Sequence, residues 1–505
     1  MTSRRIGKLL VANRGEIAVR VIRACREAGI VSVAVFSEAD REALHVLMAD
    51  EAYPIGPPPA AESYLAIEKL VAVAKKAGAD AVHPGYGFLA ENAAFAEACA
   101  AAGLTFVGPP PAAIVAMGDK TAARRIARDL GVPMVAGTLE AVASDAAARA
   151  AAREIGYPLM IKAARGGGGK GMRLVRQEGE LEAALRTARH EAAAAFGESA
   201  VYLEHYVVEP RHIEIQVLAD CHGRVVHLGE RECSIQRRHQ KLIEECPSPF
   251  VDTAMRRRMG EAACRLAMAA GYVNAGTVEF LVDAERNFYF LEMNTRLQVE
   301  HPVTEMVTGI DLVREQLRIA AGEPLGVAQA DVAWRGAAIE CRINAEDPFG
   351  GWLPSPGTIT GLRAATGPWV RDDSGVYEGY TVPRFYDTLL AKLIVWGADR
   401  ATAIERMARA LAEYKVVGVR TTIPVLAQLV KHPDFGAGRL STGFVDRILP
   451  SIRTPSGKQR SIAVIAAVLA EYERLGHRTI AEPDAATRSP WRWSPPLQSW
   501  RERTR

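Results

Sequence analysis

The chain has 505 residues, of which 49% are hydrophobic and 24% are charged, and its formal net charge at pH 7 is +3. These values are typical of a globular protein, and the length is sufficient for about three domains. The near-zero net charge provides no global field that would attract nucleic acid, and no apolar run reaches the roughly 18 residues of a membrane span. We therefore expect neither a nucleic-acid partner nor a membrane partner.

Cysteine usage and the N-terminal residues both favour a cytoplasmic protein. No two of the seven cysteines are spaced as C-x-x-C, which disfavours a zinc knuckle or a disulfide framework and suits a reducing compartment. Basic residues at Arg4, Arg5 and Lys8 precede an apolar stretch, but polar residues at 13–16 interrupt it at once. A signal peptide needs a longer apolar core, so we do not expect one.

The first 114 residues alternate between strand and helix patterns. The predicted elements, in chain order, are a strand over 8–12, a helix over 16–29, a strand over 30–37, a helix over 64–77 and a strand over 79–82. A strand, a helix and a second strand in succession are typical of a parallel sheet. A polar loop follows at 83–88, and three prolines at 109–111 close the unit, so we place the first domain boundary near Ile114.

The next segment begins with a helix and continues mainly with strands. Asp119 is a suitable N-cap for a helix through Leu130, which Gly131 and Pro133 would end. The elements predicted after it are strands over 158–163 and 172–175, a helix that reaches about residue 195, and strands over 200–206, 212–219 and 225–228.

A glycine-rich loop, Arg165-Gly-Gly-Gly-Gly-Lys-Gly171, joins the strands 158–163 and 172–175. It formally contains G-x-G-x-x-G, but a dinucleotide fingerprint opens a helix, whereas this loop forms the tip of a hairpin. The P-loop pattern also fails, because Lys170 is followed by glycine and not by serine or threonine. The backbone N–H groups of such a loop suit a flap that closes over phosphates; the alternative is a hairpin tip without a ligand.

Two lysines of this segment are candidates for phosphate contacts. Lys162 lies at the end of an apolar strand, where a buried ammonium needs a counter-charge such as a nucleotide phosphate. Lys120 lies at a predicted helix N-terminus, although a solvated surface lysine explains that position equally well. Glu204 follows Val201-Tyr-Leu on a strand that would suit an adenine site.

The stretch 230–245 is unusually dense in polar residues. Its basic run, Arg237 to Lys241, is most often a solvated face or a nucleic-acid patch, but the neighbouring Glu244 and Glu245 weaken the second interpretation. A site for a small anionic substrate is an open alternative. Cys233 has no evident base nearby, so we prefer a structural thiol to a nucleophile.

Two later runs, 277–282 and 287–294, are rich in β-branched and aromatic residues and predict a β-hairpin. A turn midway between them places Asp283 opposite Phe288.

The same register places Glu279 directly opposite Glu292. Two facing carboxylates repel each other, so a divalent cation with oxygen ligands is the natural compensation. Asn294 shares the face of Glu292 and adds a third oxygen. The polar groups that follow are too dense for an ordinary core, and they are Arg296, Gln298, Glu300 and His301.

A third unit spans about 336–450, with strands up to Trp396 and helices afterwards. Arg342 lies there among apolar strand residues, and an inward arginine needs either a carboxylate partner or an anionic substrate. Residues 451–505 differ from the rest, because an Ala/Val-rich helix over 459–475 leads into an end rich in proline, tryptophan and arginine.

Together these motifs resemble the biotin carboxylases of the ATP-grasp superfamily, in the family's order and over residues 1 to about 450. The matching strings besides the glycine loop are Ala12-Asn-Arg-Gly-Glu-Ile-Ala18, His83-Pro-Gly-Tyr-Gly-Phe-Leu89, Met117-Gly-Asp-Lys120, Pro210-Arg-His-Ile-Glu-Ile-Gln216, Gln236-Arg-Arg-His-Gln-Lys241, Glu292-Met-Asn-Thr-Arg-Leu-Gln-Val-Glu-His-Pro302 and Arg342-Ile-Asn-Ala-Glu-Asp347.

The resemblance implies an α/β fold of three domains. These are a Rossmann-like N-terminal α/β domain over 1–114, an ATP-grasp domain over 115–334 and a mixed C-terminal domain over 335–450. A mobile glycine-rich lid would span about 132–204. The family forms carboxyphosphate from ATP and bicarbonate and then carboxylates biotin on a carrier protein, so biotin is expected as a carrier-bound substrate that is not attached to this chain.

The resemblance assigns Glu279, Glu292 and Asn294 to a Mg²⁺ or Mn²⁺ ion that bridges the ATP phosphates. The further residues that it assigns to ATP are Lys120, Lys162, Gly167, Gly168, Gly169, Glu204, His205, His212, Gln236 and His239. His205 departs from the family, in which a lysine usually contacts adenine at this position, although imidazole can still hydrogen-bond a ring nitrogen.

Bicarbonate and biotin would bind beyond the nucleotide. The resemblance assigns the bicarbonate cradle to Lys241, Arg296, Gln298 and the backbone of Val299. It makes Glu300 the base that deprotonates bicarbonate, and Arg342 the group that stabilises the biotin enolate or the departing phosphate, with Tyr86 nearby. A base and a cationic cradle suit this chemistry, because bicarbonate is a poor nucleophile.

The expected partners are a biotin carboxyl carrier protein and carboxyltransferase subunits, because the chain contains no Met-Lys-Met biotinylation sequence. The family also implies a homodimer. Residues 451–505 resemble the start of the linker region in fused acyl-CoA carboxylase chains, and tryptophans often anchor interfaces. We predict that this tail, with Trp491, Trp493 and Trp500, docks on a partner; the alternative is a disordered end.

The sequence leaves the acceptor of the carboxyl group open among acetyl-CoA, propionyl-CoA, longer acyl-CoA and pyruvate. We expect an acyl-CoA carboxylase, with pyruvate carboxylase as the alternative. Another ATP-grasp ligase, such as a purine-pathway carboxylating enzyme or half of a carbamoyl phosphate synthetase, is disfavoured by residues 296–300 and 237–241. A degenerate regulatory protein is disfavoured because the candidate metal ligands and base are all present.

Overall fold

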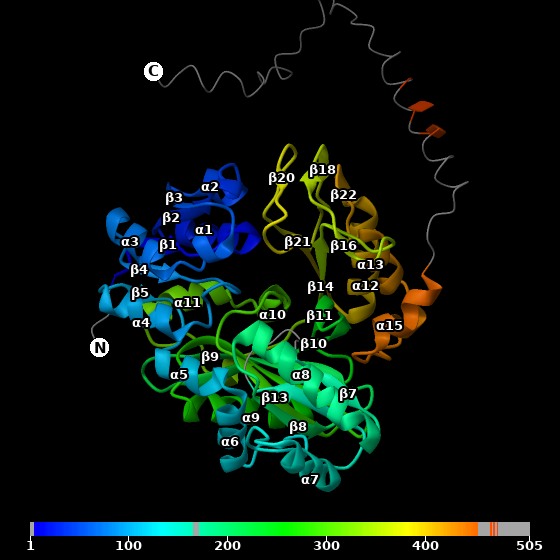
Figure 1. The fold of residues 1–505 in the computed structure, drawn as a ribbon. Helices are drawn as coiled ribbons and strands as arrows, with labels where there is room; N and C mark the ends of the chain where they lie inside the picture. Colours follow the sequence, from blue (N-terminus) through cyan, green and yellow to red (C-terminus); the bar gives the residue numbers. More distant parts are fainter. Residues whose placement is uncertain (1–4, 165–170, 453–464, 467, 470–471, 473–505) are drawn as a thin grey trace, which may run out of the picture. The chain divides into compact units, whose positions relative to one another are not determined.

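A five-stranded parallel sheet with the order β3-β2-β1-β4-β5 forms the N-terminal part of the computed structural model (Figure 1). Its strands are β1 (Lys8–Val11), β2 (Val31–Ser37), β3 (Glu51–Gly56), β4 (Ala81–His83) and β5 (Thr105–Phe106). All neighbouring strands run parallel, as the alternating pattern predicts. The helices of this part are α1 (Gly15–Glu27), α2 (Leu44–Met48), α3 (Ile67–Ala77), α4 (Ala93–Ala101) and α5 (Pro111–Gly118).

The loops after β1 and β4 meet at the carboxyl edge of this sheet. Asn13 donates its side-chain amide to the carbonyl oxygens of Pro84, at 2.7 Å, and Tyr86, at 2.8 Å. Carboxyl edges of parallel sheets are the usual place for ligands. The contact therefore fixes the polar loop 83–88 where a site can form.

A second sheet of eight strands, in the order β13-β12-β9-β10-β11-β14-β21-β19, runs through the centre of the molecule. All its neighbouring strands are antiparallel. The strands are β9 (Arg211–Ala219), β10 (Val225–Arg237), β11 (Gln240–Cys246), β12 (Asn274–Val282), β13 (Phe288–Asn294), β14 (Ala337–Asn344), β19 (Val370–Ser374) and β21 (Leu389–Gly397). The fold class predicted for these parts, mixed α/β, is confirmed.

Most of the polar stretch 230–245 lies inside this sheet, whereas its basic run at 237–241, for which a solvated face was one interpretation, forms the tip of the β10–β11 hairpin, where residues 238–240 are exposed. Glu230, Arg231 and Glu245 are almost completely buried. Each charge is paired within the interior, as with Arg231 Nε, 2.5 Å from Glu214 Oε1. Only the tip of the β10–β11 hairpin is exposed. Local pattern did not reveal the burial, because the partners come from neighbouring strands.

The β12–β13 hairpin confirms the pairing of Glu279 with Glu292, but the predicted pairing near the turn is wrong by one residue. Phe288 pairs with Val282 and not with Asp283, and the register shifts between Glu279 and Phe280. This irregularity leaves one extra residue on β13, which is a β-bulge.

The bulge also changes which residues of β13 point into the hydrophobic core. Before it, Phe288 and Phe290 contribute to the hydrophobic core; after it, Met293 does. Glu292 and Asn294 therefore point away from that core, because successive strand residues alternate between faces. If the same residues formed a regular strand, Glu292 would share the face of Phe290 and would point into the core.

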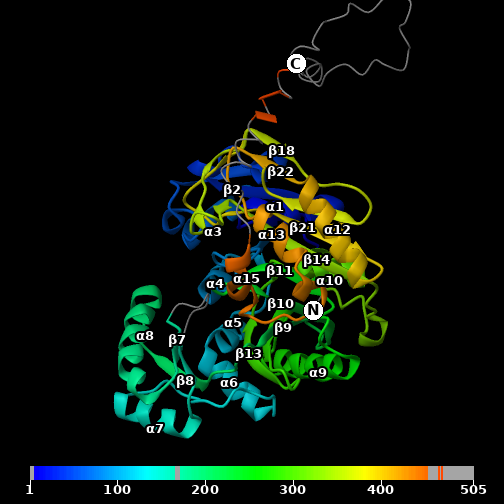
Figure 2. The ribbon, with the colours of Figure 1, turned by 90° about the vertical axis from the view of Figure 1, so that its right-hand side faces the viewer.

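The segment 132–204, predicted as a lid, contains a three-stranded antiparallel sheet, β7-β6-β8, packed on two helices (Figure 2). The elements are α7 (Asp145–Ile155), β6 (Leu159–Ala163), β7 (Arg173–Val175), α8 (Leu181–Phe196) and β8 (Val201–His205). Its small core is separate and includes Leu159, Ile161 and Leu185. The hairpin predicted for 158–175 is confirmed, as is the capping of the preceding helix, α6 (Lys120–Asp129), by Asp119.

The remaining elements surround the central sheet. The helices are α9 (Thr253–Ala269), α10 (His301–Thr308), α11 (Leu312–Ala320), α12 (Arg400–Glu413), α13 (Ile423–Val430), α14 (Pro433–Gly436) and α15 (Phe444–Ile448). The short strands are β15 (Glu346–Asp347), β16 (Leu353–Pro354), β17 (Gly357–Thr358), β18 (Gly361–Arg363), β20 (Thr381–Val382) and β22 (Lys415–Val417). His301, from the polar run 296–301, is the first residue of α10.

The structure describes residues 5–164, 171–452, 465–466, 468–469 and 472. The chain divides into a unit Met1–Ile452 and a unit Arg453–Arg505. In the second unit the described residues are helical and lie within the predicted helix 459–475, whereas Trp491, Trp493 and Trp500 lie outside the described residues. No helix of the described part is long and apolar enough to cross a membrane.

Asp372 on β19 generates a prediction about stability and pH. Burial raises the pKa of this carboxyl to about 6, although the Tyr414 hydroxyl donates to it at 3.0 Å. The folded state then binds the proton more tightly than the unfolded state, whose aspartate pKa is about 3.9. The resulting stabilisation is complete below about pH 4 and is lost as the pH rises through about 6.

We therefore expect Asp372→Asn, which cannot ionise, to raise the melting temperature relative to wild type more at pH 8 than at pH 5. Thermal unfolding followed by circular dichroism at both pH values measures the difference. If Asp372→Asn changes the melting temperature by the same amount at pH 5 and at pH 8, the raised pKa of Asp372 is contradicted.

Candidate active site

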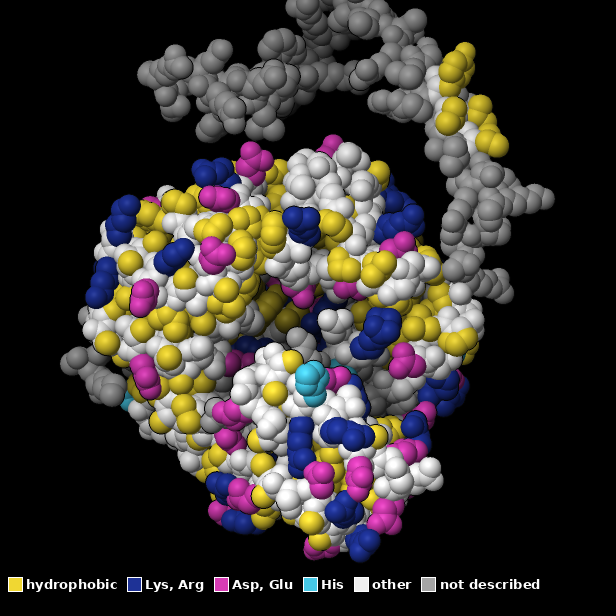
Figure 3. All heavy atoms as spheres, in the orientation of Figure 1, with side chains coloured by type: hydrophobic (Ala, Val, Ile, Leu, Met, Phe, Trp, Pro, Cys, Tyr) yellow, Lys and Arg dark blue, Asp and Glu magenta, His cyan; other side chains and the backbone are white. Residues whose placement is uncertain are grey.

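Almost all the predicted site residues line one cavity of about 890 Å³. The space-filling view shows a hollow above the lid helices (Figure 3). The predicted residues that line the cavity are Tyr86, Lys120, Lys162, Glu204, His205, His212, Gln236, His239, Lys241, Glu279, Glu292, Asn294, Arg296, Gln298, Val299 and Arg342. Gly167, Gly168 and Gly169 lie outside the described residues.

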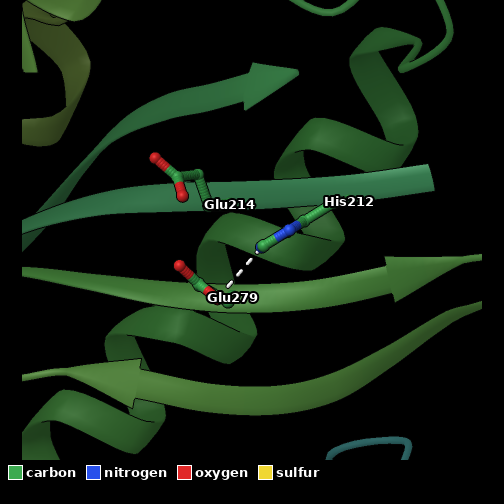
Figure 4. A group of neighbouring side chains, drawn as sticks. All are labelled: His212, Glu214 and Glu279. Atoms are coloured by element: carbon green, nitrogen blue, oxygen red, sulfur yellow. Dashed lines mark ion pairs between the residues drawn. The ribbon is translucent and has the colours of Figure 1, made fainter. Parts of the chain in front are cut away.

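Cationic side chains offset the charge of the facing carboxylates. His212 Nε2 lies 3.0 Å from Glu279 Oε2 (Figure 4). Lys241 Nζ lies 3.1 Å from Glu279 Oε1. Lys120 Nζ lies 3.1 Å from Glu292 Oε2. Burial alone would raise the pKa of Glu279, but Lys241 and His212 outweigh it and hold that pKa well below the ordinary value. Side chains of the protein thus pair with both facing carboxylates.

The oxygen donors of Glu279, Glu292 and Asn294 fit a hard divalent cation, because Mg²⁺ and Mn²⁺ prefer carboxylate and carbonyl oxygens. Among the described residues, Glu279 also belongs to a tighter group with His212 and Glu214, whose candidate ligand atoms lie within 4.8 Å of one another. Lys241 already pairs with Glu214 and Glu279 in that group. The set with Glu292 and Asn294 stays a prediction.

The counter-charge of Lys162 comes from the protein itself. Its ammonium forms an ion pair with Glu204 across the β6–β8 pair, and both side chains are more than nine-tenths buried. Arg124 lies 3.4 Å from the same carboxylate. The two residues predicted to contact phosphate and adenine therefore adjoin each other in the lid. His205 follows on the same strand, and its backbone N–H donates to Ala136 O at 2.7 Å.

Glu300 lies just below the cavity, at the N-terminus of α10, and is fully buried. Its Oε1 is 2.6 Å from Lys241 Nζ, and its Oε2 is 2.9 Å from Arg342 Nη2. Burial opposes ionisation of this carboxyl, but Lys241, Arg342 and Arg231 outweigh it and hold the pKa of Glu300 well below its usual range. Glu300 is consequently an anion that can accept a proton.

Lys241 joins the predicted metal ligands to the predicted base. Its ammonium lies 2.6 Å from Glu214, 3.1 Å from Glu279 and 2.6 Å from Glu300. Burial would lower the pKa of Lys241, but these carboxylates outweigh it and raise that pKa well above the ordinary value. The lysine is therefore a permanent cation between the two groups.

Arg296 lies on the opposite side of Gln298 from this lysine. Its guanidinium donates to Glu91 Oε2 at 3.0 Å, to Gln298 Oε1 at 2.9 Å and to Asn294 Oδ1 at 3.2 Å. Gln298 in turn donates to Glu279 Oε1 at 3.0 Å. A continuous chain of polar contacts thus connects the predicted cradle with the predicted metal ligands.

Arg342 satisfies both alternatives that the sequence left open for it, because protein carboxylates pair with it and it also lines the cavity. Its Nη2 contacts Glu300 at 2.9 Å, and its Nε donates to Glu244 Oε1 at 2.6 Å. Cys233 is buried, with Sγ 3.8 Å from Glu300 Oε1. Burial and Glu214 raise the pKa of the Cys233 thiol well above its usual range, which favours the structural interpretation.

The sequence analysis missed Glu91, Glu214 and Glu244. Glu214 could have been found, because it lies two residues after His212 on one strand and so shares its face. Glu244 faces Glu340 across β11 and β14, and only the sheet order shows that it meets Arg342. Glu91 binds Arg296 from 205 positions away, a distance at which no local pattern operates.

Three family models match the chain in succession. Residues 5–114 match the biotin carboxylase N-terminal domain, residues 119–328 the ATP-binding domain of the carbamoyl-phosphate synthase L chain, and residues 340–447 the biotin carboxylase C-terminal domain. The carbamoyl-phosphate synthase match is confined to the ATP-binding domain. Both flanking domains are those of biotin carboxylases.

Similar proteins agree with this succession of domains. A pyruvate carboxylase subunit of Methanothermobacter thermautotrophicus is 56% identical over 439 residues, which cover 87% of this chain and 89% of that protein. The propionyl-CoA carboxylase alpha chain of Ruegeria pomeroyi is 50% identical over 486 residues, which cover 92% of this chain and 71% of that protein.

A solved structure extends the similarity to three dimensions. It is the biotin carboxylase domain dimer of the Hydrogenobacter thermophilus 2-oxoglutarate carboxylase, in complex with MgADP, ADP and bicarbonate. Its TM-score is 0.87 at 47% identity, and the match covers 90% of this chain and all of that one. The chain described here belongs to the biotin carboxylase family and is an ATP-dependent ligase with biotin carboxylase activity.

Proposed function

We propose that this chain performs the first half-reaction of an acyl-CoA carboxylase, with named residues in each role. ATP and bicarbonate give carboxyphosphate and ADP, and the carboxyl group then passes to N1′ of biotin on a separate carrier protein. The observation that supports this assignment best is the position of Lys241. Its ammonium contacts both Glu279, a proposed metal ligand, and Glu300, the proposed base.

The nucleotide would be held by the lid and by the β12–β13 hairpin. Glu279, Glu292 and Asn294 would hold Mg²⁺ or Mn²⁺, which neutralises charge on the phosphoryl group during transfer. Lys120 and Lys162 would exchange their carboxylate partners for phosphate oxygens. His212, Gln236 and His239 line the same part of the cavity and would contact the nucleotide as well, and Gly167, Gly168 and Gly169 would close over its phosphates.

Bicarbonate would enter between Lys241 and Arg296, next to Gln298 and the Val299 backbone. Its arrival draws the cations away from Glu300, which weakens the effect that depresses the pKa of this carboxyl. Glu300 then takes the bicarbonate proton, and the bicarbonate oxygen attacks the γ-phosphorus, so that the bond to ADP breaks. An ionised carboxylate beside a cationic cradle supplies both the base and the charge stabilisation that this step needs.

Arg342 would act in the second step. Loss of the N1′ proton leaves negative charge on the ureido oxygen of biotin, and a guanidinium beside Glu300 is placed to stabilise it. Tyr86 lines the same end of the cavity. The phosphate released from carboxyphosphate would take the N1′ proton and leave as the carboxyl group bonds to N1′.

The carrier and the carboxyltransferase are proposed to be separate polypeptides, and the chain is proposed to be a cytoplasmic homodimer. The dimer of the related 2-oxoglutarate carboxylase domain supports the last point. Relatives named for pyruvate and for propionyl-CoA are similarly close, so pyruvate carboxylase stays the alternative to an acyl-CoA carboxylase.

The purified chain should hydrolyse ATP in a reaction that requires bicarbonate and is stimulated by free biotin. A coupled assay for ADP release, with and without each compound, measures this dependence. A requirement for an amine, together with indifference to biotin, would contradict the proposal and favour another ATP-grasp ligase.

Glu300→Gln should lower bicarbonate-dependent ATP hydrolysis by about a hundredfold or more, because the amide cannot accept the proton. Binding of MgATP, measured by calorimetry, should persist because Glu300 lies below the nucleotide side of the cavity. Retained turnover in a correctly folded variant would refute the role of Glu300 as the base.

Glu292→Gln should raise the Mg²⁺ concentration needed for half-maximal ATP hydrolysis, since a neutral amide is a weaker ligand than a carboxylate. Mg²⁺ titrations at saturating ATP measure the change. Glu285→Gln is the matched control, because Glu285 is an exposed residue of the same hairpin turn. If both variants have the Mg²⁺ dependence of the wild type, Glu292 is not a ligand.

A further inference from the structure

Lys392 is a fully buried lysine in the apolar strand β21, and none of the roles above includes it. Its ammonium donates to the carbonyl oxygen of Val299 at 2.9 Å. The same ammonium lies 3.2 Å from Glu16 Oε2 and 3.9 Å from Asp373 Oδ2. An ammonium without water is costly unless it is paired and hydrogen-bonded, so this position requires an explanation.

The three partners come from different parts of the molecule. Glu16 lies in α1 of the N-terminal part, Asp373 in β19, and Val299 in the loop between β13 and α10. Glu16 is the closer carboxylate, whereas Asp373 also pairs with Arg371 at 2.7 Å. Burial raises the pKa of Glu16 to about 7, whereas at Asp373 the nearby Arg371 and Lys392 outweigh burial and lower the pKa to about 2, so both carboxylates contribute to the charge balance. The bond to Val299 is a separate, directed contact.

Val299 O belongs to the peptide group that joins Val299 to Glu300. A peptide group is planar and rigid, so a donor that fixes its oxygen also fixes the plane from which the Glu300 backbone continues. Glu300 itself has φ −80° and ψ 12°, between the helical and extended regions, where active-site residues often lie. Lys392 therefore restrains the orientation of the Val299–Glu300 peptide group, and with it the direction in which the Glu300 side chain leaves the backbone.

Other contacts of this loop hold its first half. Thr295 N donates to Glu91 at 2.9 Å, and Gln298 donates to Glu279 at 3.0 Å. The turn that follows is closed at Gln298 O, which accepts from His301 N at 3.3 Å and lies 2.8 Å from His301 Nδ1. These contacts hold the Gln298 carbonyl, whereas Lys392 holds the carbonyl of the Val299–Glu300 peptide itself.

We propose that Lys392 is a positioning residue for bicarbonate activation, which acts through the Val299 carbonyl on the base Glu300 and on the cradle beside it. The inference rests on the proposed function, because the roles of Gln298, Val299 and Glu300 belong to it. Lys392 does not touch the substrates; it sets the geometry in which bicarbonate is bound and deprotonated. Small displacements of such groups have large effects on rate and binding.

The test separates the hydrogen bond from the ion pair. The double variant Lys392→Met, Glu16→Gln removes the ammonium together with its counter-charge, so no unpaired buried charge from this pair remains. The control variant Glu16→Gln removes only the carboxylate charge and keeps the donor to Val299. Steady-state kinetics give KM for bicarbonate, KM for ATP and kcat, and thermal unfolding monitors the stability of each variant.

We expect the double variant to raise KM for bicarbonate about tenfold and to lower kcat, with KM for ATP within about twofold of wild type. Glu16→Gln should leave KM for bicarbonate within about twofold. A purely structural lysine would change stability in both variants without this selective loss. Equal increases in KM for bicarbonate in both variants, or no increase in the double variant, would overturn the proposal.

Two further variants complete the experiment. If the double variant does not fold, Lys392→Gln replaces it, because the shorter side chain withdraws its donor from Val299 while it can still hydrogen-bond Glu16. Gln298→Ala reports on the cradle itself. If it raises KM for bicarbonate and the Lys392 variants do not, the inference alone fails; if neither changes it, the proposed cradle fails as well.

Discussion

The ammonium of Lys241 contacts Glu214, Glu279 and Glu300 within 3.1 Å, and the arrangement of the site depends on this contact. Three carboxylates would not stay ionised together in a buried space without compensating charge. Lys241 keeps two of them, Glu279, a proposed cation ligand, and Glu300, the proposed base, ionised. The same lysine thus contacts the residues proposed for the nucleotide and those proposed for bicarbonate.

The central sheet explains how residues so distant in sequence reach this ammonium. Eight antiparallel strands continue from the β12–β13 hairpin to β21 and β19, so the second and third parts of the chain share one sheet. Glu279, Lys241 and Arg342 consequently project from a common framework. The N-terminal part adds Glu91 from the end of its own parallel sheet, and the loop 295–300 is held between the two frameworks.

Much of this organisation could be predicted from the sequence, because the strand and helix patterns are local. The parallel start, the Asp119 cap and the pairing of Glu279 with Glu292 are confirmed. The prediction failed where burial depends on distant partners. The sequence does not show that most of 230–245 is buried, because the residues that neutralise its charges inside the sheet, Glu214, Arg256 and Arg400, are distant in the chain. Lys392 is a lone charge in an apolar strand, and its partner Val299 lies 93 positions away.

The bulge in β13 has a consequence for how the gene for this protein can change. The bulge separates the turn at 283–287 from the strand ends that carry Glu279 and Glu292. Descendant sequences can therefore gain or lose a codon in the turn while the two carboxylates keep facing each other. Loss of the codon for Leu291 would remove only the extra residue, so the strand would become regular, Phe290 would stay in the core and Glu292 would still face Glu279. The turn and the bulge are thus the two places in this hairpin where a change of length leaves the facing carboxylates in place.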